Sequence, residues 1–191
     1  MPLLLFLFAE TALAIPPGLG NWTVLQSDPW WVGCTPVSGV QWCRSEGEIE
    51  APLDSIYAIV GNIGRYPAVF KRIERADLVE SDVAWIRIAM PFLLTDRDYV
   101  ARFTKRKDAS SAVVDWVPAV SATAPPQSDA VRLPRAEGQW RLDAVGPART
   151  RVAYTWNGDL GSDFPSWALQ RAWVTQGAEV LTWIRDAVEP R

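Results

Sequence analysis

Hydrophobic and polar residues alternate in short runs through the middle of the chain, and short connections separate the runs. Such alternation is typical of strands that bury one face. In residues 83–90, for example, Ala84, Ile86, Ile88 and Met90 share one face. The strands predicted in this way span residues 75–80, 83–90, 97–107, 111–118, 138–144 and 149–157. The pattern therefore predicts an antiparallel sheet with one apolar face.

Helical spacing occurs before these strands and again at the end of the chain. Residues 54–62 are predicted to form one helix, residues 66–72 a short second helix, and residues 165–188 a long third one. Ser162 or Asp163 is the expected cap of the long helix, with Pro165 in its first turn. Its apolar stripe is predicted to hold Leu169, Ala172, Trp173, Gln176, Val180, Ile184 and Val188. A stripe of this length can cross a whole sheet.

Two cysteines lie in a predicted hairpin near the start of the chain. Its arms span residues 30–36 and 40–50, and a two-residue turn at Ser38-Gly39 places Cys34 opposite Cys43. A cross-strand disulfide is then feasible, and it would suit an oxidising compartment. The alternative is two free thiols, one of them buried as a small hydrophobic side chain.

The first residues are an apolar run that ends in Ala12-Leu13-Ala14, the small-x-small pattern that signal peptidase cuts. We therefore expect a signal peptide over residues 1–14 and an exported protein, periplasmic or secreted, formed by residues 15–191. No Lys or Arg precedes the apolar run, and Glu10 interrupts it. A cytoplasmic location is the alternative if the run is not a signal.

Composition excludes several kinds of function. The net charge of -3 provides no basic field for DNA or RNA, so no nucleic-acid partner is expected. The chain has no histidine, which excludes serine–histidine and cysteine–histidine catalysis and removes the commonest metal ligand, and its two cysteines alone cannot complete a four-ligand zinc site. We expect no metal, no cofactor and no catalytic residue. The 11 tryptophans exceed the needs of a core of this size and hint at a lined cavity.

Several segments together resemble one known family. They are IGRYPAVFKRIERADLVES, VAWIRIAMPFLLTDRDYVARFTKR and the stretch from VRLPRAEGQW to SDFPSWALQRAW. The strongest pieces are Arg97-Asp98 at a strand start, Gly138-x-Trp140, the TRVAY run, and residues 160–167 leading through a proline into the last helix. In this order and spacing they resemble the START family of lipid-transfer domains, in its bacterial branch, from Asn21 to Arg185.

The resemblance implies an α+β helix-grip fold, in which a curved antiparallel sheet wraps the C-terminal helix around a tunnel for a lipid, a sterol or another apolar molecule. The loop at residues 91–96 corresponds to the family's gate loop, and we expect Phe92, Leu93 and Leu94 to touch a membrane transiently or else to pack on the last helix. The chain is expected to act as a monomer. The predicted ligand-binding residues are Ile86, Ile88, Met90, Phe92, Leu93, Tyr99, Phe103, Trp116, Trp140, Tyr154, Trp156, Leu169, Trp173 and Val180.

One departure from the family bears on the ligand. Cholesterol-binding members place an acidic residue and an arginine inside the tunnel, and here those positions fall at Ala84 and Phe103. The tunnel is therefore expected to be more uniformly apolar. Arg97 and Asp98 are adjacent and therefore lie on opposite faces of their strand, where each is expected to make a strand-end salt bridge or cap, or else a direct ligand contact.

Two other functions remain open. Some helix-grip proteins are polyketide cyclases or aromatases, and Tyr99, Tyr154 and Arg97 are the residues that could form such a site here. A ligand-free protein-interaction module is the third possibility. The cavity volume distinguishes these functions. A filled core favours the interaction module, whereas an empty tunnel of several hundred Å³ favours lipid binding.

Overall fold

The computed structural model describes residues 14–91, 94–161 and 163–189. It contains a 10-stranded sheet in the order β1-β2-β3-β10-β9-β7-β6-β5-β4, with β8 paired to β6. The strands are β1 Thr23–Gln26, β2 Trp31–Val37, β3 Val40–Ile49, β4 Ile73–Leu78, β5 Val83–Ile88, β6 Asp96–Lys107, β7 Ser111–Pro118, β8 Ala130–Arg132, β9 Gly138–Gly146 and β10 Arg149–Asn157. The helices are α1 Leu53–Val60, η1 Ile63–Arg65, α2 Tyr66–Val69, η2 Ser166–Ala168 and α3 Leu169–Val188. The α+β architecture with a long C-terminal helix, predicted from the sequence, is confirmed.

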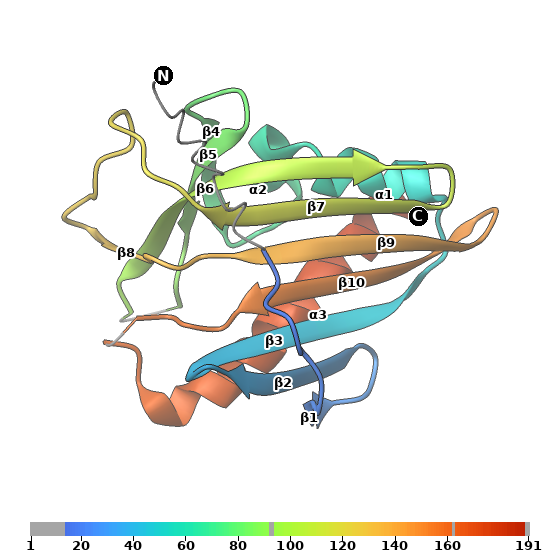
Figure 1. Cartoon of the computed structure of the whole chain (residues 1–191), viewed down its shortest axis with the longest axis horizontal. Coiled ribbons are helices and arrows are strands. Elements are labelled where there is room, and N and C mark those ends of the chain that lie inside the picture. Colours follow the sequence, from blue (N-terminus) through green and yellow to red (C-terminus); the bar gives the residue numbers. More distant parts are fainter. Residues whose placement is uncertain (1–13, 92–93, 162, 190–191) are drawn as a thin grey trace, which may run out of the picture.

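Helices cover one face of the curved sheet (Figure 1). The long helix α3 lies across β2, β3 and β10, while α1 packs on β7 and β9 and α2 packs on β4. The main core fills the space between these helices and the concave face of the sheet. On the opposite, convex face a smaller cluster of Val83, Trp85, Val100 and Ala124 is buried.

The β2–β3 hairpin forms around the predicted turn. Ser38 and Gly39 both have positive φ, 50° and 78°, as the tight two-residue hairpin turn requires. The register places Cys34 directly opposite Cys43, and the two form a disulfide. The feasible disulfide predicted from the spacing is therefore present.

The start of the long helix differs from the prediction. Residues 166–168 form a 3₁₀ turn, and α3 begins at Leu169 with Ala168 as its cap and no side-chain cap hydrogen bond. Asp163 does not cap the helix, because its carboxylate pairs with Arg97 instead. Ser162 lies outside the described residues. The N-terminal segment predicted as a signal, residues 1–14, also lies outside them except for Ala14.

The buried face of α3 is rotated slightly from the predicted stripe. Its fully buried residues are Gly177, Leu181 and Ile184, and Trp173, Val180 and Val188 pack half-buried against the same core. Gly177 was missed because a glycine adds nothing to a hydrophobic pattern. It is nevertheless the point of closest approach, since a Cβ there would lie 3.0 Å from both Ser45 and Trp156.

Candidate functional site

A continuous row of aromatic rings lines the concave face of the sheet. Phe103 stacks on Trp116 with ring centroids 6.3 Å apart, and Trp116 stacks on Tyr154 at 5.7 Å. Tyr154 in turn lies 4.3 Å from Trp140 and 4.8 Å from Trp156. These rings come from β6, β7, β9 and β10, and strand alternation turns all of them to one side. The four central strands therefore offer one apolar surface to the helices.

A small cavity lies between this surface and the helices. Its volume is about 40 Å³, and no charged side chain lines it. It is lined by Tyr66, Phe70, Ile73, Tyr99, Phe103, Trp116, Trp140, Tyr154 and Val180. Six of these were predicted, whereas Tyr66, Phe70 and Ile73 were missed because Tyr66 lies on α2, Phe70 follows α2 and Ile73 is the first residue of β4, so no strand alternation marks their inner face. A water molecule needs about 10–15 Å³ of such space, so the cavity holds a few waters at most.

The other predicted ligand-binding residues that the structure describes do not line this cavity. Ile86 is fully buried in the core and Ile88 packs half-buried against it. Met90 is half-buried after β5, and Trp156 is buried beneath Tyr154. Leu169 and Trp173 lie in the first half of α3. Phe92 and Leu93 lie outside the described residues, and Leu94, beside them, is half-buried.

The polar atoms at the cavity are uncharged. The Tyr66 hydroxyl donates to the Val60 carbonyl at 2.7 Å, and the Gln176 amide donates to the Tyr154 hydroxyl at 3.1 Å. Burial raises the pKa of Tyr154 to about 12 and raises the pKa values of Tyr66 and Tyr99 above their ordinary value as well. The phenols therefore stay neutral at physiological pH, where they offer hydrogen bonds without charge.

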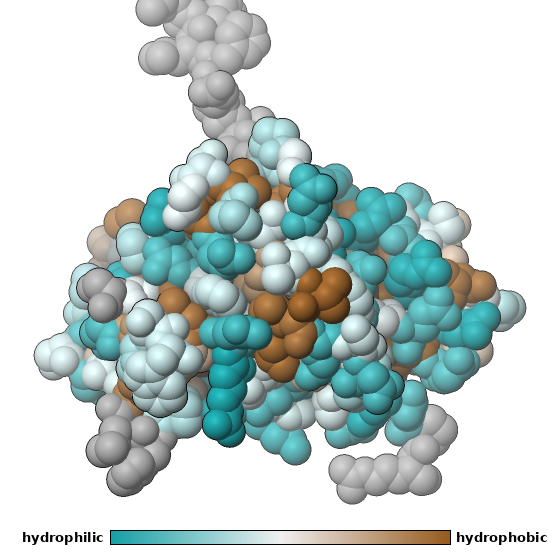
Figure 2. Space-filling view, turned by 90° about the horizontal axis from the view of Figure 1, so that it is seen from below, coloured by the Kyte–Doolittle hydropathy of each residue, from teal (hydrophilic) through white to brown (hydrophobic). Residues whose placement is uncertain are grey.

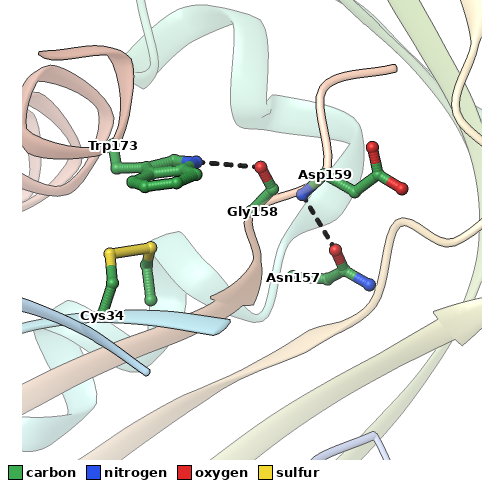
Figure 3. The surroundings of a disulfide bond; sticks show 6 residues. Cys34, Asn157, Gly158, Asp159 and Trp173 are labelled. Atoms are coloured by element: carbon green, nitrogen blue, oxygen red, sulfur yellow. Dashed lines mark hydrogen bonds between the residues drawn. A yellow bond between two sulfur atoms is a disulfide. The ribbon is translucent and has the colours of Figure 1, made fainter. Parts of the chain in front are cut away.

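Trp173 connects α3 to the end of β10. Its indole donates a hydrogen bond of 2.8 Å to the Gly158 carbonyl, in the region of the Cys34 disulfide (Figure 3). The turn after β10 is held in the same place, since the Asp159 amide donates to the side chain of Asn157 at 2.9 Å. The turn after β10 and the first half of the helix are thus joined by a hydrogen bond.

Arg97 lies at the end of the concave face where the chain enters α3. Its side chain is 0% exposed and pairs with Asp163 at 2.7 Å. It also donates to the carbonyls of Leu160 and Thr95. Arg97 thereby joins the loop before β6 to the loop before α3, and the strand-end salt bridge considered for it is present.

Asp98 points to the opposite face of β6 and takes no part in the cavity. It pairs with Arg132 of β8 at 2.7 Å and accepts a hydrogen bond from the indole of Trp85. Burial alone would raise its pKa, but the hydrogen bonds from Arg132 and Trp85 and the positive charges of Arg132 and Arg87 together outweigh burial and lower the pKa. The strand-end salt bridge is present for this residue too, on the convex side.

The arrangement gives little support to acid–base chemistry. Arg97 is occupied by Asp163 and two carbonyls, and the raised pKa of Tyr154 makes its phenol a weak acid at neutral pH.

The described residues contain no group of three or more metal-ligating side chains. Within the same residues, no helix is both long enough and apolar enough to cross a membrane.

The face along β1, β2 and α3 is mostly hydrophilic, with a compact hydrophobic group near its middle (Figure 2). Large exposed hydrophobic side chains are scattered, at Val24, Leu78, Val120 and Trp167. Single exposed side chains of this kind are ordinary on a protein surface. None of these four side chains forms a row like that of the stacked rings on the concave face.

Comparison with known proteins starts from a curated relative. An uncharacterized protein of Pseudomonas aeruginosa is 31% identical to this chain over 110 residues, which make up 56% of this chain and 54% of that protein. The match thus spans about half the length of the curated relative. No family model matches the chain.

Solved structures match much more of the chain. Human StAR-related lipid transfer protein 5 superposes with a TM-score of 0.81 at 15% identity, covering 90% of this chain and 88% of that one. A STAR-related lipid transfer protein from Xanthomonas axonopodis gives 0.73 at 21% identity, covering 87% and 98%. The two-domain aromatase/cyclase BexL gives 0.50 at 20% identity, covering 76% and 45%. The chain therefore has the START-like, helix-grip fold, in which a curved antiparallel sheet wraps a long C-terminal helix.

Proposed function

We propose that this protein binds a hydrophobic molecule between the concave face of its sheet and α3, and carries it without chemical change. The observation that carries the proposal is the row of stacked rings from Phe103 to Trp156. An apolar surface of this kind leaves water only when a helix or a ligand covers it. Structural neighbours named as lipid transfer proteins support the same reading.

Entry of a ligand requires the interior to open, because ligand pockets for small molecules measure about 300–1,000 Å³ and this cavity measures about 40 Å³. The first half of α3 is the element best placed to move. Its residues from Leu169 to Gln176 are half-buried or exposed, and none of them is fully buried. Each methylene buried on entry contributes about 0.8 kcal/mol, so a long apolar ligand can offset the cost of opening.

The interior also limits the chemistry of the buried part of the ligand. Its lining has neutral polar groups, namely the phenols of Tyr66, Tyr99 and Tyr154 and the indoles of Trp116 and Trp140, and the amide of Gln176 bonds to Tyr154. A charge placed among them would lose its hydration without gaining a partner. We therefore expect the buried part of the ligand to be uncharged. The sequence agrees, because the two tunnel positions that are charged in cholesterol-binding members of the family hold Ala84 and Phe103 here.

Three related proposals concern where the protein works. Export to an oxidising compartment is supported by the Cys34–Cys43 disulfide. Transient membrane contact of the loop at Phe92–Leu94 is supported by Trp167, which is 85% exposed in the 3₁₀ turn before α3 and has the amphipathic ring typical of membrane interfaces. A monomer is in keeping with the scattered exposed hydrophobic residues.

A second candidate function is a protein-interaction module that binds no ligand. The closed interior favours it, because a cavity of about 40 Å³ is what a packed core would leave. The two candidates differ in a measurable way: only the carrier gains stability from an apolar ligand.

The experiment is native mass spectrometry of protein purified from a lipid-supplemented extract, with identification of any released molecule. A stoichiometric adduct and a ligand-dependent rise in Tm are expected. In the variant Val180→Asp, which puts a charge into the cavity, both should be lost. The matched control is Gln170→Asp on the exposed side of the same helix, where both should persist. Repeated recovery of ligand-free wild-type protein, with no shift in Tm, would instead favour the interaction module.

A further inference from the structure

A second, larger hollow lies on the outside of the molecule, between the first helices and the sheet edge. Its volume is about 480 Å³. One wall is the end of α1 with η1, the other is the β4–β5 turn, and the floor is the far half of β6. It is lined by Tyr57, Ala58, Gly61, Asn62, Ile63, Leu78, Ser81, Asp82, Phe103 and Lys105. We call it the outer groove. Unlike the interior cavity, it is within the size range of small-molecule sites.

Phe103 lines both the outer groove and the interior cavity. Its side chain is 5% exposed and stacks on Trp116, the next ring of the concave row. Phe103 is therefore the residue that the two spaces share, and a ligand chain that ran from one to the other along it would have to displace this ring.

The outer groove carries a positive charge that the described part of the chain does not neutralise. The Lys105 ammonium donates to the Gly61 carbonyl at 2.8 Å, and no carboxylate among the described residues lies within salt-bridge distance of it. Nearby acidic groups have other partners: Asp82 pairs with Arg102, and Asp54 pairs with Lys107. An anionic group in the groove would therefore meet Lys105 without a competing internal partner.

We propose that the outer groove is the site where the anionic head of a long-chain amphiphile, a carboxylate, binds while its apolar chain passes Phe103 into the interior. This rests on the proposed function, since it assigns the charged end of the ligand that the neutral interior cannot take. Residues 103 and 105 lie on one face of β6, about 7 Å apart along the strand. A head at Lys105 thus brings the first part of the chain to Phe103, and exposed Leu78 supplies apolar contact on the wall.

The test uses cis-parinaric acid, a fluorescent C18 carboxylate, and its uncharged methyl ester. Lys105→Met should weaken binding of the acid by about tenfold, the effect of losing about 1.4 kcal/mol, and leave binding of the ester unchanged. Lys107→Met is the matched control, because Lys107 lies on the same strand but pairs with Asp54 and does not line the groove. It should bind both probes as wild type does.

A second pair of variants tests the wall of the groove. Leu78→Glu changes an exposed residue, so folding should be preserved, and it should weaken binding of both probes. Val120→Glu, at an exposed position outside the groove, should change neither. If Lys105→Met and Leu78→Glu bind both probes like wild type while Val180→Asp abolishes binding, the groove inference is overturned and the proposed function stands. If wild type binds neither probe, both fail for this ligand class.

Discussion

Arg97 and Asp163 form a pair whose two members are unequally exposed. The Arg97 side chain is 0% exposed, whereas that of Asp163 is 48% exposed. Removal of either residue breaks the same ion pair, but the charge left behind differs in its access to water. A charge left unpaired in the interior costs more than one left at the surface.

The two substitutions should therefore have unequal effects on stability. Asp163→Asn leaves the buried guanidinium without its carboxylate and should lower the free energy of unfolding by about 3 kcal/mol. Arg97→Met leaves a carboxylate that water can reach and should cost about 1–2 kcal/mol. Urea denaturation of both variants measures the difference. If Asp163→Asn lost less stability than Arg97→Met, the carbonyls of Leu160 and Thr95 would be sufficient partners for the Arg97 guanidinium.

Asp108 gives the molecule an acid-sensitive turn. The backbone amides of Ser110 and Ser111 and the Ser111 hydroxyl donate to its carboxylate, and these bonds lower its pKa from 3.8 to about 2. A lowered pKa means stability that is present above pH 3.8 and is lost as the pH falls toward 2. In the variant Asp108→Asn this contribution to the acid-induced loss of stability should be missing when the free energy of unfolding is measured from pH 5 to pH 2. If the free energy of unfolding fell equally steeply with pH in the variant and in wild type, the lowered pKa of Asp108 would be contradicted.

At the scale of elements, α3 is held against the sheet by close packing at a glycine. A Cβ at Gly177 would lie 3.0 Å from Ser45 and from the ring of Trp156, both on strands beneath the helix. Gly177→Val should push the helix outward and lower the free energy of unfolding by about 1–3 kcal/mol. Ala187→Val, at an exposed position of the same helix, should cost about 0.5 kcal/mol. Similar losses in urea denaturation would mean that α3 does not approach the sheet this closely.

The hydrophobic pattern predicted most helices and strands, because most of them are determined by residues close together in the sequence. The β2–β3 hairpin follows from its Ser38-Gly39 turn, and the alternation in β5 and β6 shows which residues face inward. The strands β1 and β8 were not predicted, because a few residues paired to a distant strand leave no periodic signal of their own. The cap assigned to Asp163 was wrong for a related reason, since its partner Arg97 is 66 residues away in the chain.

At the scale of the whole molecule, the lining of the cavity was easier to predict than its size. Tyr99, Phe103, Trp116 and Tyr154 follow from strand alternation, and the structure brings them to the same cavity. The volume depends on how their rings stack across four strands and how closely α3 approaches, and neither is encoded locally. The outer groove also escaped prediction, because α1, the β4–β5 turn and β6 meet there only in the folded chain.

The anchoring of α3 is uneven, and this predicts how the molecule opens. In the second half of the helix, Glu179 forms a two-bond pair with Arg72, and Thr182 accepts a hydrogen bond of 2.8 Å from the indole of Trp30. The buried residues Gly177, Leu181 and Ile184 also belong to this half. The first half is held mainly by hydrogen bonds from Trp173 and Gln176.

Hydrogen exchange measured by mass spectrometry should therefore show a gradient along α3. Residues 169–176 should exchange through a local opening of lower free energy than residues 177–188, while β10, paired on both sides, should exchange only with global unfolding. A bound apolar ligand should slow exchange in the first half most, because that half would close over it. Uniform protection along the helix, equal to that of β10, would mean that α3 opens only when the whole molecule unfolds, and ligand entry would then have to begin at the outer groove past Phe103.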